Sequence, residues 1–247
     1  MGDDVVFSHR AAAALHGLPS LNGWPPYVEV TTSRASGGRS SGRVRRHAGD
    51  VRWQEIVEID GVLCTSVSRT VVDIARTSPF ADAVCMADAA LHRKRRPTLL
   101  SVDELRTQAD LRLGEYAFRR VERVVAFATP LSDSVLESRS RVTIHELGFP
   151  TPILQQRWTD AQGIIGDTDF WWPEFRLCGE ADGLVKYLDR ELRRGRSPGQ
   201  VLVDEKRRED RIRACGPRMT RWISSELDPP QTLGRKLLAA GLLMGRP

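Results

Sequence analysis

GDTDFWWPEFRLCGEADG, residues 166–183, contains two apolar segments that alternate with polar residues on either side of Pro173-Glu174. This pattern is typical of a β-hairpin. If the turn is centred between residues 174 and 175, Asp169 lies directly opposite Glu180. Opposed side chains of antiparallel strands are about 5 Å apart at Cβ. The sequence therefore predicts that these two carboxylates share one patch at the end of the hairpin.

Two further acids extend this patch. Asp182 lies two residues after Glu180 and Asp167 two residues before Asp169, so each shares a strand face with its neighbour. Carboxylates so close repel one another unless a cation lies between them. Oxygen-rich groups of this kind suit Mg²⁺ or Mn²⁺. The alternative is that these acids face solvent on the polar side of a half-exposed sheet.

Glu137 and Lys186 are weaker candidates for the same site. Glu137 lies in the first turn of a predicted helix, where it either completes a capping box with Ser134 or supplies a third carboxylate to a metal. Lys186, four residues after Asp182, either orients a water and neutralises charge on a phosphate or is a solvated lysine.

Thr129-Pro130 marks the expected domain boundary, because the pattern of predicted helices and strands changes after it. The second domain, residues 131–247, is predicted to be an α/β unit with a central mixed sheet. Gln155 and Gln156 lie on its first strand, and only one of them can point inward. The predicted elements are a helix over 134–148, strands over 153–160, 163–172 and 175–183, a charged helix over 199–214, a strand over 218–224 and a final helix within 229–243.

The first domain, residues 1–130, is predicted to be mostly helical with a small β-hairpin, so the whole chain belongs to the α+β class. The hairpin over 51–66 turns at Asp60-Gly61, a strong turn dipeptide. Residues 33–47, rich in Ser, Gly and Arg, are predicted to form a mobile basic loop. The other predicted elements are a helix over 8–16 capped by Ser8, a strand over 26–32, and helices over 68–78, 79–91, 101–113 (with a Ser101–Glu104 capping box) and 115–127.

The bulk composition indicates a cytoplasmic protein with an anionic partner. The net charge is +5 and the isoelectric point is near 9.3, which favours nucleic acid. No apolar run approaches the roughly 20 residues that span a bilayer, so no membrane association is expected. The four cysteines lack C-x-x-C spacing and are predicted to be reduced, mostly buried thiols. The five histidines share no metal-ligand spacing and are expected to be structural or surface residues.

The second half of the chain resembles a nuclease family from about Ser132 to Leu227. The strings SVLESRSR, LGFPTPILQQ, DFWWPEFRLCGEADG, RACG and RWI, in this order, are similar to very-short-patch-repair-like endonuclease domains of the PD-(D/E)XK superfamily. The resemblance implies a restriction-endonuclease-like fold. It matches Glu137 to the helix glutamate, Asp169 and Glu180 to the metal-binding acids, and Gln155 or Gln156 to the glutamine of the first strand. The superfamily motif has a lysine where this chain has Asp182, and Lys186 is the nearest substitute.

The first half resembles the actinobacterial AbiEi-type antitoxins of type IV toxin–antitoxin systems. The strings SHRAAAALHGLP, DGVLCTSVSRTVVDIAR and ADAALHR carry this likeness. Members of this family start with a DNA-binding winged helix and act with a cognate toxin. No recognition-helix segment precedes Val5, so we expect the first domain to lack the winged helix.

Two functions are therefore expected. The first is a metal-dependent DNA endonuclease or related DNA-processing protein that uses Mg²⁺ or Mn²⁺. The alternative is a non-catalytic AbiEi-type antitoxin or transcriptional regulator that binds DNA. For the first function, the metal ligands would be Asp169, Glu180 and Glu137, and the catalytic set would add Asp182 and Lys186.

Overall fold

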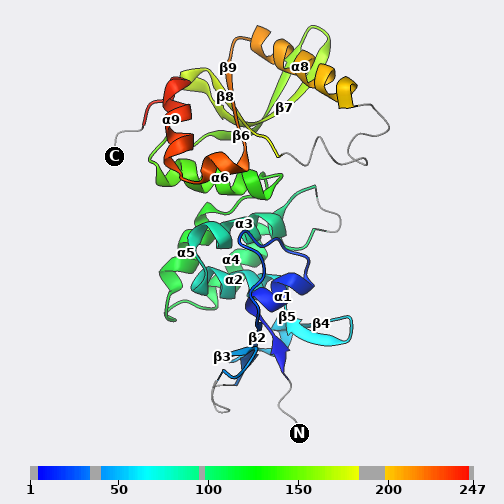
Figure 1. Cartoon of the computed structure of the whole chain (residues 1–247). Coiled ribbons are helices and arrows are strands. Elements are labelled where there is room, and N and C mark those ends of the chain that lie inside the picture. The colour runs from blue at the N-terminus through cyan, green and yellow to red at the C-terminus, as the bar shows by residue number, and fades with distance from the viewer. Residues whose placement is uncertain (1–4, 34–39, 95–97, 184–197, 245–247) are drawn as a thin grey trace. The chain divides into compact units, whose positions relative to one another are not determined.

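A computed structural model describes residues 5–33, 40–94, 98–183 and 198–244. The chain divides into two compact units, Met1–Val135 and Leu136–Pro247 (Figure 1). The sequence predicted this division at about residue 130. The protein has an α+β fold, and each unit contains one mixed β-sheet. In the described part of the chain, no helix has the length and apolar character needed to cross a membrane.

The N-terminal unit is built on a five-stranded sheet in the order β3-β2-β1-β5-β4. β1 pairs antiparallel with β2 and parallel with β5, whereas β2 and β3 run parallel. The predicted hairpin is confirmed: β4 and β5 are antiparallel, and Asp60 and Gly61 between them have φ of 50° and 79°, as a tight primed turn requires. The strands are β1 (Val6–Phe7), β2 (Val28–Thr32), β3 (Val44–Ala48), β4 (Ile56–Ile59) and β5 (Val62–Thr65).

Two predictions for this unit are wrong. The predicted basic loop over 33–47 includes most of β3, because arginines are tolerated on a sheet edge where side chains reach solvent; residues 34–39 lie outside the described part. Ser8 occupies the N-cap position of α1 (His9–Leu15) but makes no capping bond with its side chain. Its hydroxyl is bonded instead to His9 Nδ1 at 2.9 Å.

The helices of this unit lie close to their predicted ranges. The capping box of Ser101 and Glu104 is confirmed at the start of α4. α2 buries one face that includes Val71, Val72 and Ile74. These helices are α2 (Val67–Thr77), α3 (Phe80–Leu91), α4 (Val102–Asp110) and α5 (Phe118–Phe127).

The C-terminal unit has a four-stranded sheet in the order β6-β7-β8-β9 (Figure 1). The pairs β6–β7 and β7–β8 are antiparallel, and β8–β9 is parallel, which confirms the predicted mixed sheet. All six predicted regular elements and the final helix are present. They are α6 (Val135–Glu146), β6 (Ile153–Asp160), β7 (Gly163–Trp172), β8 (Leu177–Ala181), α8 (Pro198–Ala214), β9 (Arg218–Trp222) and α9 (Gln231–Ala239).

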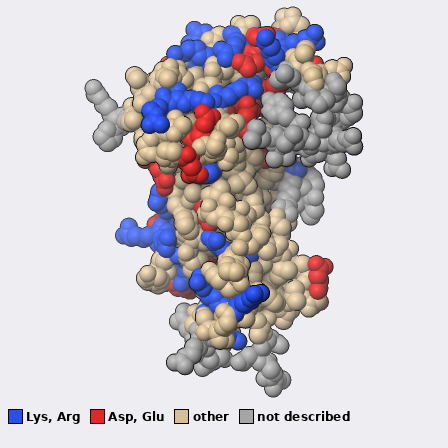
Figure 2. Space-filling model, in the orientation of Figure 1, with Lys and Arg blue, Asp and Glu red and all other residues tan. Residues whose placement is uncertain are grey.

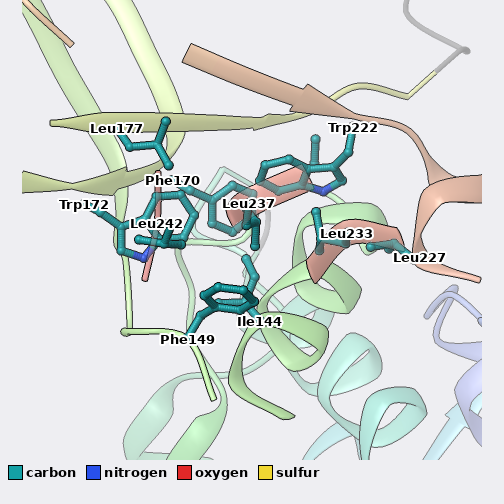
Figure 3. Close-up of a cluster of buried hydrophobic side chains, with 11 residues drawn as sticks. Ile144, Phe149, Phe170, Trp172, Leu177, Trp222, Leu227, Leu233, Leu237 and Leu242 are labelled. Atoms are coloured by element: carbon teal, nitrogen blue, oxygen red, sulfur yellow. The ribbon is translucent and has the colours of Figure 1, made fainter. Parts of the chain in front are cut away.

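The core of the C-terminal unit lies between the sheet and helices α6 and α9. Figure 3 shows Phe170 and Trp222 of the sheet directed toward Leu233 and Leu237 of α9 and Ile144 of α6. The indole N–H of Trp222 donates to Ser140 Oγ at 2.7 Å, so the ring's single polar group is satisfied inside the core. These contacts bury one face of the sheet. α8 packs on the opposite face, where the acidic residues lie.

Three cysteines are buried, namely Cys64, Cys85 and Cys178, and Cys215 is exposed; all four are free thiols. This distribution confirms the prediction of mostly buried, reduced thiols. Burial raises the pKa of Cys178 to about 12, which makes its thiol inert near neutral pH.

Candidate functional site

The β7–β8 hairpin has the register that the sequence predicted. Trp172 pairs with Leu177, Trp171 with Cys178 and Phe170 with Gly179, so the pairing is centred between residues 174 and 175. Continuing this register by one step places Asp169 opposite Glu180. The backbone N–H of Ala181 donates to Asp169 Oδ2 at 2.8 Å, which ties the two strand ends together.

Glu180 is buried, with 4% of its surface exposed, and both of its carboxylate oxygens are bonded to arginines. Arg208 from α8 donates to Oε1. Arg221 from β9 lies beside Glu180 in the parallel register and reaches Oε2 at 2.8 Å. The pKa of Glu180 is raised, mainly by burial and to a smaller extent by the charge of Asp169, although the two guanidinium groups act in the opposite direction.

Glu205, three residues before Arg208 on α8, contacts the same two arginines. It accepts from Arg208 Nη2 and Arg221 Nη2, each at 2.8 Å. Burial raises its pKa, but these contacts outweigh burial and bring the pKa to about 2. Asp182 lies 3.3 Å from Arg221 Nη1. We call Glu180, Asp182, Glu205, Arg208 and Arg221 the arginine–carboxylate network.

Glu137 lies on α6, and the two glutamines lie on β6. Gln155 Nε2 donates to Glu137 Oε2 at 3.1 Å, and Glu137 is buried. Gln156 Nε2 instead donates to the carbonyl of Arg157 at 2.7 Å. Of the two glutamines, Gln155 is therefore the one that contacts Glu137. Its φ of 53° is unusual for a residue in a strand.

Asp167, another acid of the predicted patch, is bonded through its carbonyl by Arg208 Nη1 at 3.1 Å and through its carboxylate by a different arginine. Asp167 is bonded by Arg157 of β6, with Nε to Oδ1 at 2.9 Å, so it pairs across β6–β7. Lys186 lies outside the described residues.

As arranged, the described acids do not fit a divalent cation. Among these residues, no group of three His, Cys, Asp or Glu side chains is placed to hold a metal ion. A guanidinium group already lies against each oxygen of Glu180, and two like charges at one carboxylate disfavour a third. The second acid of the expected metal pair is therefore neutralised by protein cations.

Sequence reasoning missed Arg208 and Arg221. Figure 2 shows blue and red side chains adjoining one another at the top of the view, on the C-terminal unit. One signal was available for Arg221. It precedes the buried Trp222 on β9, and neighbours on a strand face opposite sides, so it had to point away from the core.

Exposed arginines lie on the N-terminal unit along β3, the edge strand of its sheet. Arg43, directly before β3, and Arg45 within it are exposed. The Arg45 guanidinium carbon lies 4.1 Å from the ring centre of Tyr27, within cation–π range. Charges on an edge strand prevent pairing with other chains, and they also suit contact with phosphates.

Comparisons with known proteins give a distant likeness. The chain is 27% identical over 208 residues to Uncharacterized protein MT2308 of Mycobacterium tuberculosis strain CDC 1551 / Oshkosh. The same values hold for Uncharacterized protein Rv2248 of strain ATCC 25618 / H37Rv. The alignment covers 83% of this chain and 71% of each relative, so it includes parts of both units. No family model matches the chain, and no solved structure matches it.

Proposed function

We propose that the protein binds DNA and that its nuclease-like C-terminal unit serves as a binding scaffold rather than as a metal-dependent cleavage site. The observation that carries this proposal is the pairing of both Glu180 oxygens with Arg208 and Arg221. An acid that is fully engaged with two cations is poorly suited to hold a metal as well. This is the non-catalytic alternative of the two expected functions.

The support for DNA as the partner is electrostatic. The net charge is +5, and the sugar-phosphate backbone attracts basic proteins irrespective of sequence. Arg43 and Arg45 present guanidinium groups along an edge strand. The Arg45 guanidinium group packs over the ring of Tyr27. A cognate toxin as a further partner stays a prediction from the resemblance.

The second candidate is the metal-dependent endonuclease. The hairpin register favours it, because continuing the observed pairing puts Asp169 opposite Glu180, and the charge of Asp169 raises the pKa of Glu180. This candidate requires Glu180 to be released from its two arginines.

One experiment separates the two candidates. The wild type and an Asp169→Ala variant are incubated with supercoiled plasmid and Mg²⁺ or Mn²⁺, and parallel samples without metal are run as gel shifts at low salt. We expect a DNA shift and no metal-dependent nicking. Nicking by the wild type that Asp169→Ala abolishes would establish the endonuclease instead. If the folded protein shifts no DNA at low salt, the proposal that it binds DNA is wrong.

A further inference from the structure

The two edges of the N-terminal sheet differ in how well they are protected from pairing with other strands. β3, at one edge, carries Arg45 and Arg46, and such charges oppose pairing. β4, at the other edge, has three apolar residues and one acid, with no lysine, arginine or proline. Figure 1 shows the β4–β5 hairpin at the margin of this unit. β4 is therefore the less protected edge.

The backbone groups of β4 that face the open edge follow from its pairing with β5. The N–H of Ser66 donates to the carbonyl of Glu55 at 2.7 Å, and bonded and non-bonded pairs alternate along an antiparallel ladder. Every second residue counted from Glu55 therefore bonds to β5. The N–H and C=O groups of Ile56 and Glu58 point away from β5, and no described strand lies beyond them.

Apolar side chains reach solvent beside this open edge. Val57 of β4 is 36% exposed, and Trp53 of η2 (Trp53–Glu55), directly before β4, is 79% exposed. A strand edge that combines unpaired backbone groups with exposed apolar side chains is a template for pairing with another chain. The edge of β4 is therefore suited to a further strand.

The charges at the two ends of β4 are of opposite sign and have no ion pair in the described part of the chain. Arg52, before η2, is exposed, as are Glu58 near the other end of the strand and Asp60 in the turn. An antiparallel neighbour of the same sequence brings its acidic end beside the basic end of the first copy. This complementarity favours a second copy of the hairpin over a strand of unrelated sequence.

We propose that two copies of the chain associate through their β4 strands, antiparallel and about a two-fold axis at Val57. In this register Val57 faces Val57 of the second copy, and Ile56 of each copy faces Glu58 of the other. The outward N–H and C=O groups of Ile56 and Glu58 then bond to one another, and Asp60 of one copy lies toward Arg52 of the other. β3 of each copy stays at an outer edge of the joined sheet. The association does not rest on the proposed DNA binding.

Cysteine cross-linking of the full chain tests this register. A non-bonded antiparallel pair, as Val57 makes with its counterpart, has Cα atoms about 4.5 Å apart, within the roughly 4.4–6.8 Å range of disulfides. Glu58 and its counterpart are two residues out of step, which places their Cα atoms about 8 Å apart and outside that range. All cross-linking variants carry Cys215→Ser, because Cys215 is an exposed thiol.

We expect Val57→Cys to form a disulfide-linked dimer under mild oxidation at least about tenfold more efficiently than Glu58→Cys, because only the first pair is within disulfide range. Glu58→Cys is the matched control, since Glu58 is the exposed neighbour of Val57 on the same strand. Equal cross-linking of the two variants would mean that the copies meet by random collision, and it would overturn the proposal.

Sedimentation velocity without oxidant gives an independent measurement. The wild type should pass from monomer to dimer as its concentration rises. Val57→Lys, a change at an exposed side chain, should raise the dissociation constant by about tenfold or more, because two like charges would face one another across the axis.

A wild type that stays monomeric at every concentration, together with a Val57→Cys variant that forms no cross-link, would overturn the proposal. Species that grow beyond a dimer would also overturn it, because head-to-tail pairing of β3 with β4 gives open chains of copies rather than a closed pair. DNA binding by a monomeric protein would leave the proposed function unaffected, and a dimer that shifts no DNA would leave the association unaffected.

Discussion

His9 gives the N-terminal unit a pH signature at the scale of one residue. Its folded pKa is about 4, against 6.5 for an ordinary histidine. Burial is the main cause. Of the charged groups around the ring, Asp73 and Glu29 raise its pKa, while His47 and Arg69 lower it. Below pH 6.5 the unfolded chain therefore binds a proton that the folded chain does not, and stability is lost as the pH falls toward 4.

We expect this single group to remove about 3 kcal/mol of the free energy of unfolding between pH 7 and pH 4, at 1.36 kcal/mol for each unit of pKa. The measurement is urea unfolding of the wild type and His9→Gln across this range. His9→Gln should lose less stability than the wild type by that amount. Parallel curves for the two proteins would show that folding does not lower the pKa of His9.

Glu180 is the residue on which the arginine–carboxylate network depends most. Replacing it with alanine leaves two partly buried guanidinium groups with fewer partners, a change that typically costs about 3–5 kcal/mol. Arg208 and Arg221 are about a quarter exposed and keep Glu205, so we expect about 3 kcal/mol in denaturant unfolding. Glu174→Ala, at an exposed position, is the control and should change stability by less than about 0.5 kcal/mol. Equal effects of the two substitutions would mean that the network does not stabilise the fold.

At the scale of elements, the rings of Trp222 and Trp172 can pack against β8 because residue 179 has no side chain. A Cβ on Gly179 would lie 2.5 Å from Trp222 Cη2 and 3.1 Å from Trp172 Cζ3. Both rings are fully packed in the core, so neither can move away freely. We expect Gly179→Ala to lower the free energy of unfolding by about 1–3 kcal/mol. Gly183→Ala, where the space is open, should be nearly neutral; a neutral Gly179→Ala would show that the rings can shift.

The elements of the C-terminal unit were predictable because their signals are local. Alternating apolar residues predict the extents of β6 and β7, and the symmetry of the hairpin predicts the pairing of β7 with β8. The missed strands, β1 and β3, have no such signal. β1 has two residues and is held by partners distant in sequence, and the arginines of β3 hide its alternation.

The candidate site was predictable only in part, for the same reason. The position of Asp169 relative to Glu180 follows from one hairpin, whereas the arginines on Glu180 come from α8 and β9. The packing of α8 on the sheet decides which helix residue reaches the buried acid. The periodicity of the sequence does not specify this packing. The stack of His9 on His47 likewise joins α1 to β3, so no spacing along the chain indicates it.

For the whole molecule, the net charge of +5 predicts DNA binding that weakens steeply with salt. Each arginine that contacts a phosphate adds about 0.9 to the slope of log affinity against log salt concentration. If Arg43 and Arg45 make such contacts, Arg43→Ser/Arg45→Ser should reduce that slope by about 2. The measurement is fluorescence anisotropy with a labelled duplex over a salt series.

A double variant of equal charge tests whether position or net charge is responsible. Arg106 of α4 and Arg119 of α5 are exposed arginines of the same unit, so Arg106→Ser/Arg119→Ser removes the same two charges away from β3. If contacts along β3 carry the binding, this control keeps the wild-type slope while Arg43→Ser/Arg45→Ser loses about 2 from it. Equal losses in both variants would mean that DNA responds to the overall field of the protein. The two double variants have the same net charge, so only local contacts with DNA can make their slopes differ. Equal slopes would therefore mean that the arginines of β3 protect the sheet edge and do not contact DNA.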